Sequence, residues 1–111
     1  MKTHEVVRQG GKNIFKDLKL PNAEELNAKA QIAYRICGIL EERKLTQQEA
    51  ADLLGTDQPR VSALLRGRLE GFSSDRLFRF LNALDQDIEI VIRQANKESS
   101  HAPGIRVLVP A

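Results

Sequence analysis

The sequence has no tryptophan and only one cysteine, one methionine and one tyrosine among its 111 residues. The single thiol, Cys37, cannot form a disulfide within the chain, which is typical of the reducing cytoplasm. Two histidines, His4 and His101, are too few to complete a metal site with it. We therefore expect no disulfide framework and no bound metal, and a core built mostly from Leu, Ile, Val and Ala.

Long apolar runs are absent as well. No stretch reaches the roughly 18 consecutive apolar residues of a membrane span, and the start from Met1 to Gln9 lacks the apolar run of a secretory signal. These absences indicate a soluble protein that stays in the cytoplasm.

The sequence also lacks recognisable catalytic patterns. We find no nucleophile spaced with a base and no paired carboxylates of the kind that catalysis requires. Gly10 and Gly11 are not followed by the strand-to-helix pattern of a phosphate-binding loop. The sequence therefore predicts no catalytic residues, no cofactor and no enzymatic activity.

The chain has no large excess of positive or negative charge, because 17 basic side chains are nearly balanced by 15 acidic ones, for a net charge of +2. This net charge alone does not indicate a nucleic-acid partner. A basic surface that could bind nucleic acid must instead be sought in the local placement of the charges. The chain length leaves room for one compact domain.

Apolar residues recur at helical spacing in four segments. Cys37 falls on the apolar face of the first of them, so we expect an inert, packed thiol. The predicted helices are a long one at about 23–44, a short one of about eight residues between Thr46 and Gly55, a third at about 58–66 and a fourth that Ser74 caps and that ends near Asp85.

The two short helices carry strong end signals. Thr46 and Glu49 have the spacing of a capping box, and Gly55 ends that helix. Asp57 can cap the next helix, with Pro59 in its first turn, where a missing N–H is harmless. Two capped helices joined by a tight turn are the helix-turn-helix arrangement of proteins that read the DNA major groove.

From Asp87 onward the apolar period changes to two, which predicts a strand with Ile88, Ile90 and Ile92 on one side. A single strand leaves backbone groups unpaired, so it needs a partner. The partner could be the tail at 105–109, as a possible short strand, or a second subunit. We favour the second subunit, because the pair would then hold two DNA-reading helices about 34 Å apart, as a palindromic operator requires.

The helix at 58–66 is expected to be two-faced. Val61, Leu64 and Leu65 should point into the core, leaving polar and basic side chains outside. Between Gln58 and Arg68 there are three arginines and no acidic residue. This local excess of positive charge favours DNA, although an ordinary solvated helix face is the alternative.

The chemistry of these side chains suits base and phosphate recognition. A glutamine can bond adenine, and an arginine can bond guanine or phosphate. We expect Gln47 to touch a phosphate while bracing Gln58, and Arg68 to hold a phosphate. The residues expected to contact DNA are Gln47, Gln58, Pro59, Arg60, Ser62, Arg66 and Arg68.

The segment Leu45-Thr46-Gln47 through Ala50-Ala51 and Leu54-Gly55, then Gln58 through Val61-Ser62-Ala63-Leu64 and Gly67, resembles the Xre group of Cro and lambda-repressor-like domains. The resemblance covers roughly residues 30–85. It implies an all-α, lambda-repressor-like helix-turn-helix domain of four to five helices, here with a short C-terminal β-strand for dimerisation. It also implies DNA contacts at Gln47, Gln58, Pro59, Arg60 and Ser62. Pro59 departs from the pattern, because this position often carries a hydrogen-bonding side chain.

The strand from Ile88 to Ile92 and the segment from Asn13 to Glu25 resemble those of small Xre proteins akin to antitoxins of the HigA type. That resemblance implies a repressor of its own operon with a RelE-like toxin as partner; a stand-alone repressor is an equal alternative. A protein-protein adaptor that neutralises a partner without reading bases is a further one. The expected divisions are an N-terminal arm at 1–21, partly flexible, the DNA-binding domain at 22–86, the dimerisation strand at 87–94 and a polar tail at 95–111.

Overall fold

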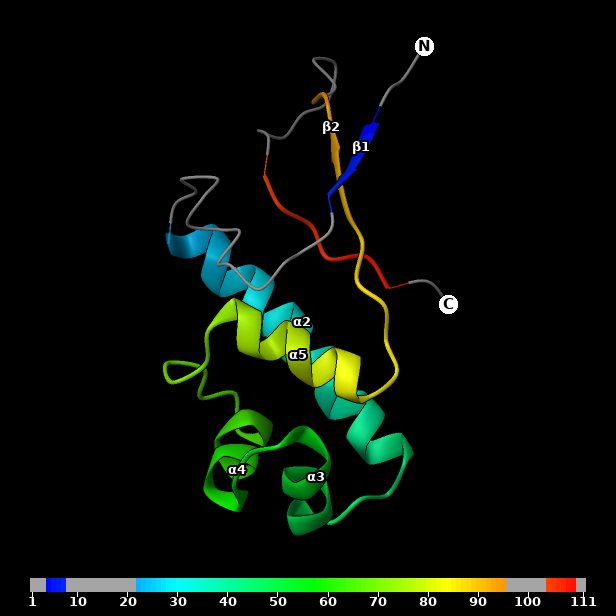
Figure 1. The fold of residues 1–111 in the computed structure, drawn as a ribbon. Coiled ribbons are helices and arrows are strands. Elements are labelled where there is room, and N and C mark those ends of the chain that lie inside the picture. The colour runs from blue at the N-terminus through cyan, green and yellow to red at the C-terminus, as the bar shows by residue number, and fades with distance from the viewer. Residues whose placement is uncertain (1–3, 8–21, 96–103, 110–111) are drawn as a thin grey trace.

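The computed structural model describes residues 4–7, 22–95 and 104–109, and within these ranges the protein has four helices and one two-stranded sheet (Figure 1). Most of the expected arm at 1–21 and most of the polar tail at 95–111 lie outside the described residues. In chain order the elements are β1 (His4–Val7), α2 (Asn22–Glu42), α3 (Gln47–Leu54), α4 (Gln58–Leu65), α5 (Ser74–Ala83) and β2 (Ile90–Arg93).

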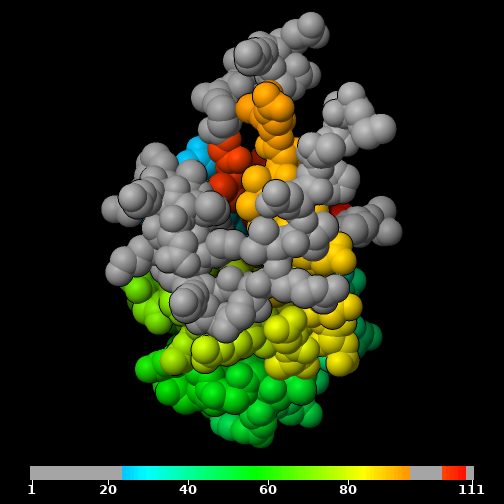
Figure 2. Space-filling view, turned by 45° about the horizontal axis from the view of Figure 1, so that its top comes forward, coloured from blue at the N-terminus to red at the C-terminus, as the bar shows by residue number. Residues whose placement is uncertain are grey.

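The long helix α2 and the amphipathic helix α5 pack together in the middle of the molecule (Figure 1). The pair α3 and α4 lies at one end, and the sheet lies at the other. In the space-filling view the green atoms of the α3 and α4 region form one end of the surface (Figure 2). The helical segments contribute most of the core, whose largest fully buried apolar side chains are Ile36, Val61, Leu64, Leu77 and Leu84. The predicted all-α fold with a short C-terminal strand is confirmed.

The ends of α3 are fixed by their own residues. Thr46 Oγ1 accepts from the Glu49 amide at 3.1 Å, and Glu49 Oε1 accepts from the Thr46 amide at 2.8 Å, so the predicted capping box is formed. Gly55 ends the helix in the left-handed conformation, at φ 71°. The Thr56 amide then donates to Ala51 O at 2.9 Å, the contact that closes a Schellman motif.

Two details of the helices correct the sequence analysis. Ser73, not Ser74, caps α5, since Ser73 Oγ accepts from the Arg76 amide at 3.1 Å. Ser74 is fully buried, and its hydroxyl has no hydrogen-bond partner in the described part of the chain. Leu65, predicted to face the core, is 44% exposed because α4 ends at this residue.

The strand β2 pairs antiparallel with β1, in a register that sets Val7 opposite Ile90 and His4 opposite Arg93. Its observed partner is therefore the start of the same chain, within the expected arm at 1–21, and neither the tail at 105–109 nor the second subunit that the sequence analysis favoured. The sequence analysis did not identify this partner, because β1 is only four residues long and its alternation is too short to recognise.

Residues 104–109 do not form the short strand that their alternation suggested. They run extended beside α2, where the Ile105 amide donates to Glu24 Oε2 at 3.3 Å. Ile105 and Val107 pack against the edge of the core. None of the helices within the described ranges combines the length and apolar character needed to cross a bilayer.

Candidate nucleic-acid interface

Helix α4 is held by two side chains on its inner face, Val61 and Leu64, each only 1% exposed. Gln58, Pro59 and Arg60 are exposed at its start. Ser62 and Ala63 are partly exposed, and Arg66, which caps the C-terminal end, is exposed. The helix therefore presents a polar, basic side to solvent while the opposite side is anchored in the core, as the sequence predicted.

Gln47 and Gln58 occupy the first positions of α3 and α4, and both are exposed. No hydrogen bond joins the two side chains among the residues that the structure describes. The expected bracing of Gln58 by Gln47 thus stays a prediction for the DNA-bound form.

Asp57 caps the N-terminal end of α4 and also meets a side chain of that helix. Its Oδ1 accepts from the Arg60 amide at 2.9 Å, while its Oδ2 lies 3.8 Å from Arg60 Nε. Both side chains remain about half exposed, at 61% for Asp57 and 49% for Arg60. The sequence analysis gave Asp57 only the capping role; the spacing of three residues between an aspartate and an arginine was the available signal for the ion pair.

Arg68 follows Gly67, which adopts the left-handed conformation at φ 75°. The Arg68 amide donates to Ala63 O at 2.9 Å, so the backbone at the start of this loop is tied to α4. The Arg68 side chain is exposed and lines a cavity together with residues of α4, and its contact with a DNA phosphate stays a prediction.

A shallow cavity of about 310 Å³ lies between α4 and the loop that follows it. Arg60 and Arg68 both line it, and Glu70 lines it with them. Between residues 57 and 70 the three arginines are thus accompanied by two carboxylates, Asp57 and Glu70. The basic character of this surface is weaker than the interval 58–68 alone suggests. The full lining is Pro59, Arg60, Ala63, Arg68, Glu70, Gly71 and Phe72.

The thiol of Cys37 connects α2 to α4. Its Sγ donates to Leu64 O at 3.7 Å, and burial raises the pKa of the thiol above its ordinary value of 9.0. A thiol with a raised pKa is a poor nucleophile at neutral pH. Cys37 is therefore part of the packing behind α4, as expected.

The three isoleucines assigned to dimerisation differ in their surroundings. Ile88 is partly buried against the protein's own core. Ile90 is partly exposed, and Ile92 is 44% exposed in the strand β2. Within the described ranges no cluster of His, Cys, Asp or Glu has a metal-binding arrangement.

Comparison with known proteins agrees with this geometry. A family model described as a helix-turn-helix domain matches residues 14–93. A solved structure described as an XRE family transcriptional regulator is 46% identical, with a TM-score of 0.74. The match covers 81% of this chain and all of that one. No curated protein matches.

The family match spans more than half of the chain, and the solved relative shares both fold and sequence. The family is one of transcription regulators and not of enzymes. The chain therefore belongs to the Xre-type helix-turn-helix family.

Proposed function

We propose that this protein is a sequence-specific repressor that binds double-stranded DNA with α4 in the major groove. The observation that carries the proposal is the orientation of α4, with Val61 and Leu64 buried while Gln58 and Arg60 are exposed. A major groove about 12 Å wide accepts one helix, and α3 would cross the DNA backbone and hold α4 at depth.

Each exposed side chain has a proposed role. Gln58 offers an amide that can donate to and accept from adenine, and Arg60 offers paired N–H groups for guanine. Pro59 would make apolar contact, and the small Ser62 allows close approach to the base edges. Gln47, Arg66 and Arg68 would bind the DNA backbone, which orients the protein without reading sequence.

The test begins with selection from a duplex pool with a randomised central segment, followed by binding measurements on the selected duplex. Gln58→Ala should cost about 1–3 kcal/mol on that duplex and relax the preference at one base position. Arg79, exposed on α5, offers a matched control, and Arg79→Ala should keep the preference. Loss of affinity by the same factor on every duplex would argue against base reading by Gln58.

We further propose that the protein binds a palindromic operator as a homodimer. The pairing with β1 occupies one edge of β2, so a second copy of β2 could add to the other edge. Ile92, which is 44% exposed and shares a face of β2 with Ile90, would gain cover from such an addition. Because its proposed ligand is operator DNA, we expect the protein to act in the cytoplasm.

A second function, neutralisation of a RelE-like toxin, is favoured by the outer side of α2. Tyr34 is 83% exposed there, beside a cavity of about 460 Å³ whose walls include Ala30, Gly38 and Val107. Exposed aromatic side chains beside a cavity are common at protein interfaces.

Co-expression with the product of an adjacent reading frame for a small basic protein tests this role. Tyr34→Ala should abolish co-purification and leave DNA affinity unchanged; retained co-purification would place the contact elsewhere.

A further inference from the structure

We infer that Asp57 is a specificity-determining residue, which orients the guanidinium of Arg60 for base reading and restrains it from binding DNA phosphates at random. This inference rests on the proposed function and names how its site discriminates. Asp57 acts through Arg60 and is therefore a positioning residue.

The first step concerns the two oxygens of one carboxylate. Oδ1 accepts from the Arg60 amide at 2.9 Å, which is the ordinary task of a helix cap. The other oxygen, Oδ2, takes no part in the cap and lies 3.8 Å from Arg60 Nε. The same side chain thus accepts a hydrogen bond from the Arg60 backbone and forms a longer ion pair with its guanidinium.

The second step concerns charge. Serine, asparagine and aspartate cap helices about equally well, so capping does not require a negative charge at position 57. A carboxylate at the start of a helix that enters DNA is repelled by the phosphates. The charge of Asp57 therefore opposes binding in general, and its contact with Arg60 is the one that a neutral cap would not supply.

The third step concerns which edge of the guanidinium is free. The contact to Asp57 is made by Nε, on one side of the planar group. The edge formed by the two terminal nitrogens stays available, and a pair of parallel N–H groups matches O6 and N7 of guanine. Arg60 is half exposed, so this edge can reach a base while the hydrogen bond from the Arg60 amide to Asp57 stays intact.

The ion pair is exposed, and such pairs add little to folding stability. Its effect is expected in recognition, because a tethered arginine loses less conformational freedom on meeting the correct base. An arginine released from Asp57 would reach neighbouring phosphates, which are the same in every sequence.

The experiment uses the full chain and the duplex obtained by selection, together with its single-base variants. The position read by Arg60 is first defined as the one whose preference disappears in Arg60→Ala. Asp57→Asn keeps a capping side chain and removes the charge. It should reduce discrimination at that position about fivefold or more, the lower range for one paired base contact, and raise affinity for random duplex DNA. The position read by Gln58 should be unaffected.

Three further proteins make the result specific. In the Arg60→Ala background, Asp57→Asn should leave discrimination unchanged. Glu70→Gln removes a carboxylate from the same cavity, and among the described residues Glu70 makes no ion pair with Arg60. It should raise affinity for all duplexes and keep base discrimination. Asp57→Ser, a second neutral cap, should repeat the effect of Asp57→Asn if the latter folds poorly.

The inference is overturned if both neutral caps discriminate as the natural protein does, if they lose discrimination equally at all positions, or if Arg60→Ala changes no base preference. In each of these cases the proposed function stands as long as the natural protein prefers its selected duplex. A natural protein that binds every duplex alike would instead remove the proposed function, and this inference with it.

Discussion

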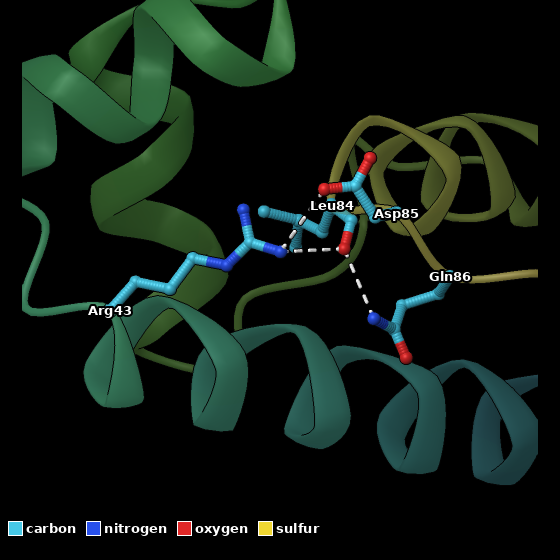
Figure 3. Close-up of polar contacts among 4 residues, drawn as sticks. All are labelled: Arg43, Leu84, Asp85 and Gln86. Carbon is cyan, nitrogen blue, oxygen red and sulfur yellow. Dashed lines mark hydrogen bonds and ion pairs between the residues drawn. The ribbon is translucent and has the colours of Figure 1, made fainter.

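The guanidinium of Arg43 donates a hydrogen bond of 2.8 Å from Nη2 to the backbone carbonyl of Leu84 (Figure 3). Arg43 directly follows α2, and Leu84 caps the C-terminal end of α5, so the bond joins the ends of the two central helices. Gln86 Nε2 donates to the same carbonyl at 3.0 Å, and Asp85 Oδ2 lies 3.6 Å from Arg43 Nη2. One carbonyl therefore accepts hydrogen bonds from two side chains, one from the distant Arg43 and one from Gln86 two residues later.

Replacing Arg43 by methionine should lower the free energy of unfolding by about 1 kcal/mol, because a partly buried carbonyl loses a charged donor. Urea denaturation followed by circular dichroism measures the change. Asp85→Asn is the control: Asp85 is 88% exposed, and removing an exposed ion pair should change stability by less than about 0.5 kcal/mol. An equal loss in both variants would assign the effect to the ion pair and not to the hydrogen bond.

The capping box of α3 predicts a particular dependence on pH. The Thr46 amide, and then its hydroxyl, lower the pKa of Glu49 below its ordinary value of 4.5. A lowered pKa in the folded state means that Glu49 stabilises the protein above its unfolded pKa, and that this contribution is lost as the pH falls through the folded value. Glu49→Gln removes this titration.

Denaturation at several pH values should therefore show a stability difference between the natural protein and Glu49→Gln that is constant near neutral pH and shrinks below about pH 4.5. Thr46→Ala should cost about 1 kcal/mol at neutral pH and remove the same dependence. A difference that stays constant down to low pH would show that the charge of Glu49 has no part in the cap.

Arg68 provides a prediction about phosphate binding. Arg68→Ala should weaken binding to every duplex, and the slope of log affinity against log salt concentration should fall by about one unit, because one fewer counterion is released. Fluorescence anisotropy over a series of salt concentrations measures both quantities. Arg79→Ala, on α5, should leave the slope as it is. If the slope is unchanged in Arg68→Ala as well, Arg68 does not contact the backbone.

The proposed dimer is tested at Ile90, which lies opposite Val7 in the sheet. Ile90→Lys should give monomers in light scattering and weak operator binding, since it places charge on the apolar side of β2. Val91→Lys changes the adjacent residue, on the other face of the strand, and is the matched control. A dimer that survives Ile90→Lys would locate the interface on another surface.

The elements that the sequence predicted well are those with local causes. Thr46, Gly55 and Asp57 define the ends of α3 and the start of α4 through contacts within a few residues, and the structure contains each of them. The identity of the family could also be inferred, because the spacing of small, apolar and glycine positions reflects how two short helices pack.

One feature that the sequence analysis missed depends on a contact between distant parts of the chain, and two others are local. The partner of β2 begins 86 residues earlier, at His4, and a four-residue strand carries almost no periodic signal. Leu65 fits the apolar spacing of α4, but the helix ends there, so the pattern alone could not show that its side chain is exposed. The Asp57–Arg60 ion pair was not predicted, because the capping role alone explained the presence of an aspartate at this position.

Both β1 and the segment at 104–109 lie toward the end of the molecule opposite α4 (Figure 1). A fluorophore attached within β1 or within the segment at 104–109 would therefore lie away from the helix that is proposed to enter DNA. Surface immobilisation through these segments should leave the groove-reading side facing solution, which makes real-time measurement of duplex capture practical with a single tethered orientation.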